Sequence, residues 1–428
     1  MKYLIFLIFG LIFLPGLTSL ASPSLKNVES DREGSIQQYE FVLDIYGNAD
    51  MNWIIDDADL EYIEAVIKGT AHETQYADAD GDGIIGPKDL AKVKEIIAGK
   101  AKSITVIDAS GSRVTIQLPV NRIVTLVPWG TRTLVQLGVQ SRIVGIDTYT
   151  TRGSKYADLL VFLRVCPWLT DLTNLGTSDA PNKEVMASLH PDLILAGQIK
   201  GDQIEILKKT SGCPSVFQPR DSTRGTDYAI ENGPYENWLT LGYILGKKDR
   251  ALDIIAFCEK EFREIGDRLK NLTRTQKKTA WYCSGKINRG SWMYSPILLA
   301  GGAMPSEEGP PFFGEIQLEQ VLKWDPDIIF VQYWPHLSGM IKEIKNNKVL
   351  SFLKAVKNNQ LIYLRNGRLG HDSGFSAAEV WYIAKILYPD RFMDINVEQR
   401  ANKVLEFLYG TPGLYTWEIN KRPVFKIW

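Results

Sequence analysis

The sequence predicts an α/β protein with two lobes that are bridged by one long helix and preceded by a small all-α module. Three features of the chain indicate this architecture. From residue 103 onward, short β-rich runs alternate with helical stretches, as they do in α/β folds. Lys247–Leu269 contains no proline and reads as a single helix. The segment that begins at Asn48 returns thirty residues later, at Asp78, which indicates two copies of one small unit.

Length and composition restrict the class of protein. The chain has 428 residues, more than one ordinary domain holds, and its 49 Lys and Arg balance 50 Asp and Glu to a net charge of −1. Dedicated nucleic-acid binders normally carry a basic excess that matches the phosphates, so this class is disfavoured. The 11 Trp and 18 Tyr exceed what a core requires and are candidates for ligand contacts.

The N-terminus indicates export. Lys2 precedes an apolar run over Tyr3–Leu14 that closes on Ser19-Leu20-Ala21, so we expect a signal peptide over 1–21 and a polar linker over 22–39. The alternative is an uncleaved membrane anchor. The protein is therefore expected in the periplasm or on the outer cell surface. Disulfides are then permitted, although the spacing of the four cysteines does not reveal a pairing and free thiols are equally compatible.

The repeated segment, over 40–100, places oxygen ligands at positions 1, 3, 5, 7 and 12 of a twelve-residue loop in each copy. Calcium prefers such a set of hard oxygen ligands, with the position 7 ligand supplied by a backbone carbonyl. The ligands would be Asn48, Asp50, Asn52, Ile54 and Asp59 in the first loop and Asp78, Asp80, Asp82, Ile84 and Asp89 in the second.

The two loops are not equivalent. The second has Gly83 at position 6, where a sharp turn favours glycine, whereas the first has Trp53 there and two Asn ligands in place of Asp. We therefore expect Ca²⁺ binding at the second loop in preference to the first. The repeat resembles dockerin, an EF-hand-like calcium module, and this resemblance implies a cohesin domain as a partner. The alternative is an acidic helical pair without metal.

The elements of the N-terminal lobe, over 103–246, follow in order along the chain. We expect a hairpin of Ile104–Ile107 and Val114–Gln117, strand Arg122–Leu126, helix Thr131–Leu137, strand Arg142–Ile146, helix Lys183–Leu189 and strand Leu193–Ala196. The C-terminal lobe, over 276–410, begins a second series. It should contain strand Thr279–Tyr282, helix Gln317–Lys323, strands Ile328–Val331 and Leu361–Leu364, and helices Ser376–Leu387 and Val397–Leu408, before a tail over 411–428.

Two features relate the lobes to each other. A helix, a Pro-Asp pair and a strand occur in the same order at Leu189–Ile194 and at Trp324–Ile329. Between the lobes, the linking helix, over 247–271, should bury one side. That side consists of Ala251, Ile254, Ile255, Cys258, Phe262, Ile265 and Leu269. Two similar lobes joined in this way favour a ligand site between them.

The motifs of both lobes resemble one family. Arg122–Pro128, Leu137-Gly138-Val139 and Val144–Asp147 resemble the first lobe of ABC-importer binding proteins for iron-siderophore, haem and cobalamin. Gly301-Gly302, Leu318–Leu322 and Pro326–Ile329 are similar to the second lobe. The resemblance, over residues 103–410, implies two Rossmann-like lobes that bind a metal chelate and deliver it to a membrane permease. It implies no enzymatic activity.

The same resemblance implies docking residues for the permease. The matching positions are Glu184 and Glu319, which each stand eight residues before the Asp of the repeated Pro-Asp pair. The alternative is that each glutamate only complements a helix dipole. Arg132 stands where the family often has a further glutamate in the first lobe, and the sequence departs from the pattern there.

Ligand contacts are expected from loops between the lobes. Trp129 and Tyr149 follow predicted strands, where α/β folds bind ligands, and aromatic faces and Arg side chains suit a large anionic chelate. The full set of candidates is Trp129, Tyr149, Arg152, Trp292, Phe313, Trp334, Arg365, Arg368 and His371. Each aromatic residue could instead serve packing, and each Arg could be solvated.

Two other classes of function are disfavoured or remain open. Four His are too few for a naked zinc cargo, although His371 could be an axial ligand to haem or a corrinoid. The main alternative is a dockerin-bearing extracellular enzyme, or a component of a scaffold or an adhesion system. The chain has no G-x-S-x-G and no H-E-x-x-H motif, which counts against the enzyme.

Overall fold

The computed structural model describes residues 41–197, 207, 213–217, 233–291, 294–304, 313–365 and 373–425. The chain divides into two units, residues 1–38 and 39–428, and every described residue belongs to the second. The expected signal peptide and polar linker lie outside the described residues.

The repeat module contains two helices of equal length, α1 (Asp57–Ile67) and α2 (Pro87–Ile97), which pack against each other. Each follows one of the acidic loops. The glycines that end the two copies, Gly69 and Gly99, have φ of 71° and 64°, a left-handed conformation that suits the residue after a helix. The apolar side chains that these helices bury include Ile63, Val66, Val93 and Ile96.

The expected hairpin is present as β1 (Ser103–Ile107) and β2 (Arg113–Gln117), an antiparallel pair with Ile104 opposite Ile116. It forms a two-stranded sheet that is separate from the sheets of the lobes. Residues 44–46 of the module extend this hairpin on its β1 side, where Ile45 forms a β-bridge with Val106.

The N-terminal lobe contains a five-stranded sheet in the order β5-β4-β3-β8-β9, with every neighbouring pair parallel. The strands are β3 (Ile123–Thr125), β4 (Ile143–Ile146), β5 (Thr173–Asn174), β8 (Leu193–Ala196) and β9 (Ser215–Phe217). The other elements of this lobe are α3 (Pro128–Gln136), α4 (Phe162–Val165), α5 (Lys183–Ser188) and a small hairpin of β6 (Gly176–Thr177) and β7 (Ala180–Pro181). The expected strands and helices are confirmed, whereas β5 and β9 are too short to show a sequence pattern.

The C-terminal lobe contains a second five-stranded sheet in the order β12-β11-β10-β13-β14. The strands are β10 (Ala280–Ser284), β11 (Lys286–Ser291), β12 (Phe313–Glu315), β13 (Ile328–Gln332) and β14 (Leu361–Leu364). The pairs β10–β13 and β13–β14 are parallel, while β11 is antiparallel to both its neighbours. The sequence did not predict β11, because its side chains are mostly polar and lack the apolar alternation of a strand.

The helices of this lobe are α9 (Ser295–Leu299), α10 (Leu318–Trp324), α11 (Met340–Asn346), α12 (Lys354–Lys357), α13 (Ser373–Leu387), α14 (Val397–Tyr409) and α15 (Leu414–Lys421). The expected helices near 317–323, 376–387 and 397–408 correspond to α10, α13 and α14. Helix α15 lies in the segment that the sequence suggested only as a tail.

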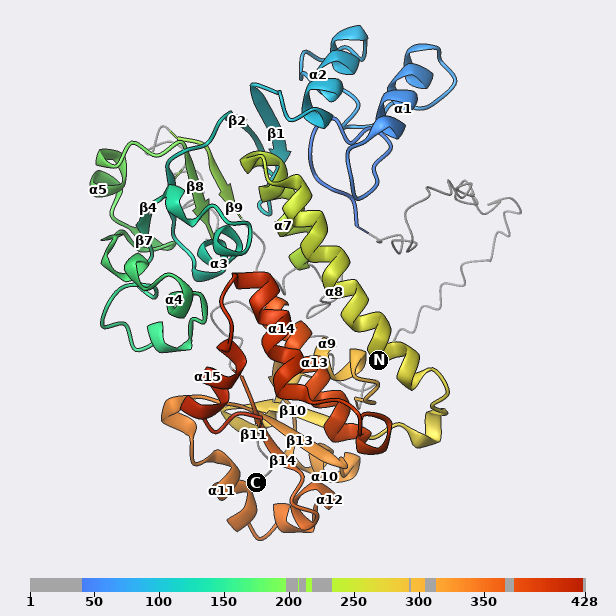
Figure 1. Ribbon diagram of the computed structural model, residues 1–428, viewed down its shortest axis with the longest axis vertical. Coiled ribbons are helices and arrows are strands. Elements are labelled where there is room, and N and C mark those ends of the chain that lie inside the picture. The colour runs from blue at the N-terminus through green and yellow to red at the C-terminus, as the bar shows by residue number, and fades with distance from the viewer. Residues whose placement is uncertain are drawn as a thin grey trace, which may run out of the picture. The chain divides into compact units, whose positions relative to one another are not determined.

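Helix α8 (Lys248–Leu269) extends from the N-terminal lobe to the C-terminal lobe (Figure 1) and follows α7 (Gly233–Leu245). The seven apolar residues expected on its inner side are all buried. At one end Arg250 Nε donates to Gln136 O of α3, and at the other Arg268 forms a bidentate pair with Asp394 at 2.7 and 2.8 Å. The long linking helix is therefore confirmed and is held at both ends.

The repeated Pro-Asp pair has the same structural role in both lobes. The residue before each proline, His190 or Asp325, is left-handed, with φ of 45° and 40°. The aspartate that follows accepts a hydrogen bond from the chain at the start of the central strand of its sheet. Asp192 Oδ2 accepts from Arg122 N at 2.8 Å, and Asp327 Oδ2 accepts from Thr279 N at 2.9 Å. The lobes are thus built alike.

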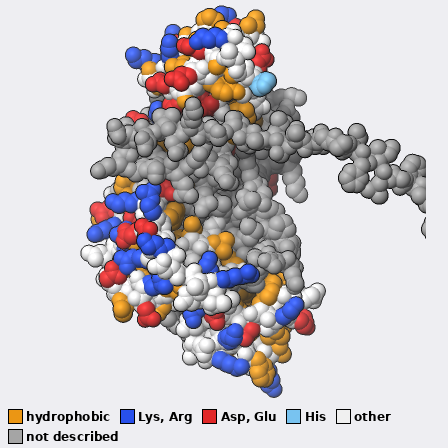
Figure 2. Space-filling view, turned by 90° about the vertical axis from the view of Figure 1, so that its right-hand side faces the viewer, with side chains coloured by type: hydrophobic (Ala, Val, Ile, Leu, Met, Phe, Trp, Pro, Cys, Tyr) orange, Lys and Arg blue, Asp and Glu red, His pale blue; other side chains and the backbone are white. Residues whose placement is uncertain are grey.

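Three further observations bear on the expectations. The four cysteines all lie within the described residues, and none of them forms a disulfide. Among the described helices, none is both long and apolar enough to cross a membrane. Figure 2 shows basic, acidic and hydrophobic side chains interspersed over the coloured residues, in keeping with the near-zero net charge.

Candidate functional site

A buried polar network lies at the carboxyl ends of β10 and β13. Ser284 is the last residue of β10 and Gln332 the last of β13, and Ser284 Oγ donates to Gln332 Oε1. Trp334 Nε1 donates to the same oxygen at 3.0 Å, so the indole is fixed at this edge of the sheet and only 5% exposed. Carboxyl ends of parallel strands are where α/β sheets bind ligands. Trp334 therefore lies where the sequence placed it, with its polar atom engaged by the protein.

The N-terminal lobe presents aromatic residues at the corresponding ends of β3 and β4. Trp129 lies in the first turn of α3 and is buried. Its indole ring packs so closely against Gly197 that a Cβ there would lie 2.5 Å from the ring. Tyr149 is half-buried and makes an edge contact with Tyr156, at 5.5 Å between ring centroids. Of the two predicted residues, Tyr149 is thus the more exposed and the more accessible to a ligand.

Asp147, directly after β4, organises the turn that carries Tyr149. Its carboxylate accepts hydrogen bonds from Tyr149 N at 2.8 Å and from Thr150 Oγ1 at 2.7 Å. Burial raises the pKa of Asp147 to about 6, while these hydrogen bonds favour the ionised form. Asp147 was not among the predicted site residues, although its position directly after an apolar strand was a usable signal.

The arginine candidates have different surroundings. Arg152 is exposed and pairs with Asp171, with 2.9 Å between Nε and Oδ1. Arg365 directly follows β14 and is mostly buried. Its Nη2 donates to Leu159 O at 2.6 Å, its Nε lies 3.4 Å from Glu418, and its guanidinium covers the Phe375 ring at 4.5 Å. Arg365 is therefore part of a network that joins the lobes.

The remaining ligand candidates lie outside the described structure. Trp292, Arg368 and His371 are not among the described residues, and only the backbone of Phe313 is, at the start of β12. Their predicted contacts stay predictions.

The two docking candidates occupy equivalent places. Glu184 is the second residue of α5 and Glu319 the second residue of α10, and both side chains are exposed. Each helix leads into a Pro-Asp pair and then into the strand next to the central strand of its sheet. Both carboxylates are thus accessible, and each lies at the same point of the same supersecondary unit in its lobe.

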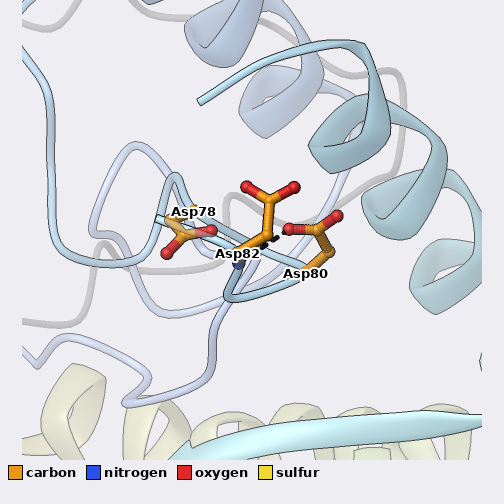
Figure 3. A group of neighbouring side chains, drawn as sticks. All are labelled: Asp78, Asp80 and Asp82. Carbon is orange, nitrogen blue, oxygen red and sulfur yellow. Dashed lines mark hydrogen bonds between the residues drawn. The ribbon is translucent and has the colours of Figure 1, made fainter. Parts of the chain in front are cut away.

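The second loop of the module brings three carboxylates together. Oxygens of Asp78, Asp80 and Asp82 all lie within 4.8 Å of one another (Figure 3), which fits a divalent cation. Asp89, at position 12, accepts from Asp80 N and from Gly86 N, and so ties the loop to α2. Lys88 Nζ lies 2.8 Å from Asp82 Oδ2 and competes for one of the predicted ligands.

The first loop repeats this arrangement in a more buried form. Asp59 accepts from Asp50 N at 3.2 Å and from Asp56 N at 2.8 Å, as Asp89 does in the second loop. Asn48 is fully buried, and its Nδ2 donates to Leu43 O and Asn52 O. Asn48 Oδ1 is buried and has no hydrogen-bond partner among the described residues. A cation at this position would satisfy that oxygen, so the residues present fit calcium.

The pKa of Asp59 also fits a calcium ion at the first loop. Burial and the neighbouring Asp50 carboxylate raise the pKa of Asp59 to about 8. A bound cation would favour the ionised carboxylates instead. In the first loop, the buried Asp59 carboxylate and the buried Asn48 oxygen, two of the predicted ligands, would therefore both be stabilised by a cation.

Two α/β lobes with central parallel strands, joined by one long helix, define a bilobal binding protein. Residues 123–367 match the periplasmic binding protein family. The match covers more than half of the chain, and the protein belongs to this family.

The relatives are solute-binding proteins. The chain is 22% identical over 320 residues to the molybdate-binding protein MolA of Haemophilus influenzae, which covers 70% of this chain and 89% of that protein. It is 29% identical over 198 residues to the Fe(3+)-citrate-binding protein YfmC of Bacillus subtilis, covering 45% of this chain and 59% of the relative.

Solved structures show the same fold. The structure of MolA bound to molybdate superposes with a TM-score of 0.59 at 20% identity, over 72% of this chain and 98% of that one. CeuE of Helicobacter pylori superposes with a TM-score of 0.58 at 19% identity, over 74% and 99%. The expected fold class, two α/β lobes with a linking helix, is confirmed.

Proposed function

We propose that this protein is the extracytoplasmic solute-binding protein of an ABC importer and that it carries a metal chelate to a membrane permease. The observation that carries the proposal is the contact between Arg365 and Leu159. It brings the carboxyl end of β14 next to the N-terminal lobe, and ligands of α/β sheets bind at such ends. A ligand held there would contact both lobes. The protein would act by binding and release, without catalysis.

The linking helix limits how the lobes move. Helix α8 is continuous over 22 residues and is anchored to both lobes by Arg250 and Arg268. A continuous helix resists bending far more than a loop hinge does. We therefore propose small rotations of the lobes on binding, with most of the site formed before the ligand arrives.

The cargo we favour is a ferric siderophore, haem or cobalamin. Tyr149 is half-buried near the end of β4, and Trp334 is fixed at the end of β13. Large, partly apolar chelates gain contact area on such rings. The relatives named for iron compounds support this class.

A second candidate cargo is a metal oxyanion. The relative named for molybdate is similar over more of this chain than the relatives named for iron. Small oxyanions are bound by hydrogen-bond donors and cationic side chains.

Titration of the purified full chain distinguishes these cargoes. Trp fluorescence is followed while ferric siderophore, ferric citrate, haem, cobalamin, molybdate or sulfate is added. We expect a saturable response to one chelate, and a response to molybdate alone would move the cargo to the oxyanions. A full set of flat titrations would overturn both cargo classes. Trp334→Phe should reduce the response, and Trp168→Phe, a partly exposed tryptophan in the turn after α4, is the matched control.

The remaining elements of the proposal concern partners. We propose that Glu184 and Glu319 contact basic residues of the permease, one on each lobe. We also propose that the repeat module binds Ca²⁺ at both loops and a cohesin domain through its surface. The clustering of Asp78, Asp80 and Asp82 supports the cation. Calorimetry with CaCl₂ and capture of a cohesin domain with and without chelator test these two steps separately.

A further inference from the structure

Tyr243 of the N-terminal lobe contacts the repeat module directly. This residue lies in α7, and its hydroxyl accepts a hydrogen bond from Ile55 N at 2.9 Å and donates one to Ile55 O at 3.1 Å. Ile55 is position 8 of the first loop and is fully buried. One hydroxyl from the body therefore satisfies both backbone groups of a residue within the loop.

The β1–β2 hairpin forms a second attachment. Tyr46 N donates to Thr105 O, and Ile107 N donates to Asp44 O, so the chain just before the first loop pairs with β1. The guanidinium of Arg113, in β2, covers the Tyr46 ring at 4.2 Å. It also lies against Gly81 of the second loop, where a Cβ would be 2.0 Å from Nη2.

Helix α7 continues the connection into both lobes. Trp238 Nε1 donates to Gln136 Oε1 of α3 at 2.8 Å, and Gln136 Nε2 donates to Tyr409 of α14 at 3.0 Å. These side chains are buried. Ile55, Tyr243 and Trp238 thus belong to one continuous packed region, and such regions unfold cooperatively.

The two loops differ in their relation to this region. The last ligand position is buried in both loops, as Asp59 and as Asp89. At the first position Asn48 is buried but Asp78 only half-buried, and the intervening predicted ligands are half-buried in the first loop and exposed in the second. Asn48 Oδ1, the buried oxygen without a hydrogen-bond partner among the described residues, belongs to the first loop, which Tyr243 contacts. The first loop therefore has more of its predicted ligands within the packed region than the second loop has.

We propose that the first loop is a structural cation site that stabilises the two lobes as well as the repeat module. The contact of Tyr243 with Ile55 would couple cation binding at this loop to the stability of α7 and the N-terminal lobe. This inference rests on the proposed calcium binding. A cation that binds the folded loop alone stabilises everything that unfolds together with that loop. A module tethered by a mobile linker would stabilise only itself.

Calorimetric unfolding of the full chain tests the coupling. In wild type we expect the main transition, which reports the lobes, to shift upward by about 2–5 °C when chelator is replaced by saturating Ca²⁺. Tyr243→Phe removes the hydroxyl and should reduce this calcium-dependent shift to less than half. Tyr363→Phe is a matched control, because Tyr363 also accepts from a backbone N–H, of Ile341, and donates to a backbone carbonyl, of Ser338, but within the C-terminal lobe.

The control should lower the unfolding temperature while preserving the calcium shift. Asp82→Ala, in the exposed second loop, should also preserve most of it. An equal calcium shift in wild type and Tyr243→Phe would overturn the coupling, as would a separate small transition that moves while the main one stays in place.

Hydrogen exchange of the wild type provides a test that needs no variant. Calcium should slow exchange in α7 as well as in the first loop, and slowing confined to residues 41–100 would overturn the proposal. Titration calorimetry distinguishes failure of calcium binding from failure of the coupling between the first loop and the lobes. Absence of calcium binding overturns the cation site and the coupling together, whereas binding with an unmoved main transition overturns the coupling alone.

Discussion

Arg365 Nη2 donates a hydrogen bond to the backbone carbonyl of Leu159 at 2.6 Å and so joins the C-terminal lobe to the N-terminal lobe. The neighbouring residue Asp158 pairs with Lys421 of α15 at 2.8 Å. Arg365 also contacts Glu418 of the same helix, and Glu418 is almost fully buried. Helix α15, which lies beyond the family match at 123–367, therefore takes part in holding the lobes together.

Replacement of Arg365 by Ala should destabilise the protein strongly. The change removes the link to Leu159 and leaves the buried Glu418 with Arg422 as its remaining basic partner. Loss of one partner from a buried ion pair typically costs about 3–5 kcal/mol, and the second arginine should keep the loss near about 3 kcal/mol. The free energy of unfolding is measured in urea. Arg152→Ala is the control: its exposed pair with Asp171 should contribute less than about 1 kcal/mol, and equal losses would contradict the assignment.

Glu379 should make stability depend on pH. Full burial raises its pKa from 4.5 to about 7, partly offset by a hydrogen bond from Tyr294 and by the charge of Arg365. Between these two values the folded protein binds more protons than the unfolded chain, so stability falls as pH rises through this window.

Comparison of wild type with Glu379→Gln isolates this effect. The variant cannot ionise there, and its stability relative to wild type should rise by about 3 kcal/mol between pH 4.5 and pH 7.5. Urea unfolding at several pH values provides the measurement. A difference that stayed constant over this range would show that Glu379 does not titrate within it.

Lys88 should weaken calcium binding at the second loop. Its ammonium group pairs with Asp82, one of the three clustered carboxylates. Lys88→Ala frees this ligand, and we expect calcium to bind about two- to fivefold more tightly, the range of an exposed ion pair. Lys94→Ala removes the same charge from the last turn of α2 and is the control. Titration calorimetry checks both, and an unchanged affinity in Lys88→Ala would exclude competition by the lysine.

Charge reversal at the docking residues should separate delivery from binding. Glu184→Lys and Glu319→Lys should each lower uptake through the permease by at least about tenfold, because both carboxylates are exposed and would meet basic partners. Ligand affinity, measured by Trp fluorescence, should stay unchanged. Glu343→Lys, at an exposed position of α11, is the matched control. Uptake that survives reversal at both sites would contradict docking through them.

Local patterns in the sequence predicted much of the fold. The apolar side of Lys248–Leu269 repeats at helical spacing, and all of its expected members are buried. The Pro-Asp pairs at 191–192 and 326–327 predicted two similar lobes, and both aspartates bond to the start of a central strand. Strand β11 escaped prediction, since it is antiparallel and polar, and its pairing with β10 depends on a partner strand rather than on its own residues.

The candidate site was predictable only in outline. Tyr149 follows strand β4, and its position after a predicted strand was enough to select it. Trp334 was selected as an aromatic residue of the loops expected between the lobes. Arg365 was selected as a charged residue of the same loops. Its contacts with Leu159 and Glu418 could not be predicted, because the partners lie 206 and 53 residues away in the chain.

Patterns among near neighbours in the sequence were enough to predict the duplicated acidic loops, the long helix and the strands that follow the Pro-Asp pairs. These follow from side chains a few residues apart, which determine turns, caps and buried faces. By contrast, three features follow only from the packing of the folded chain: Tyr243 forms hydrogen bonds with Ile55, Arg365 joins the two lobes, and Asn48 Oδ1 is buried without a partner among the described residues. Such contacts depend on how distant segments pack, and no local pattern encodes a partner more than a hundred residues away.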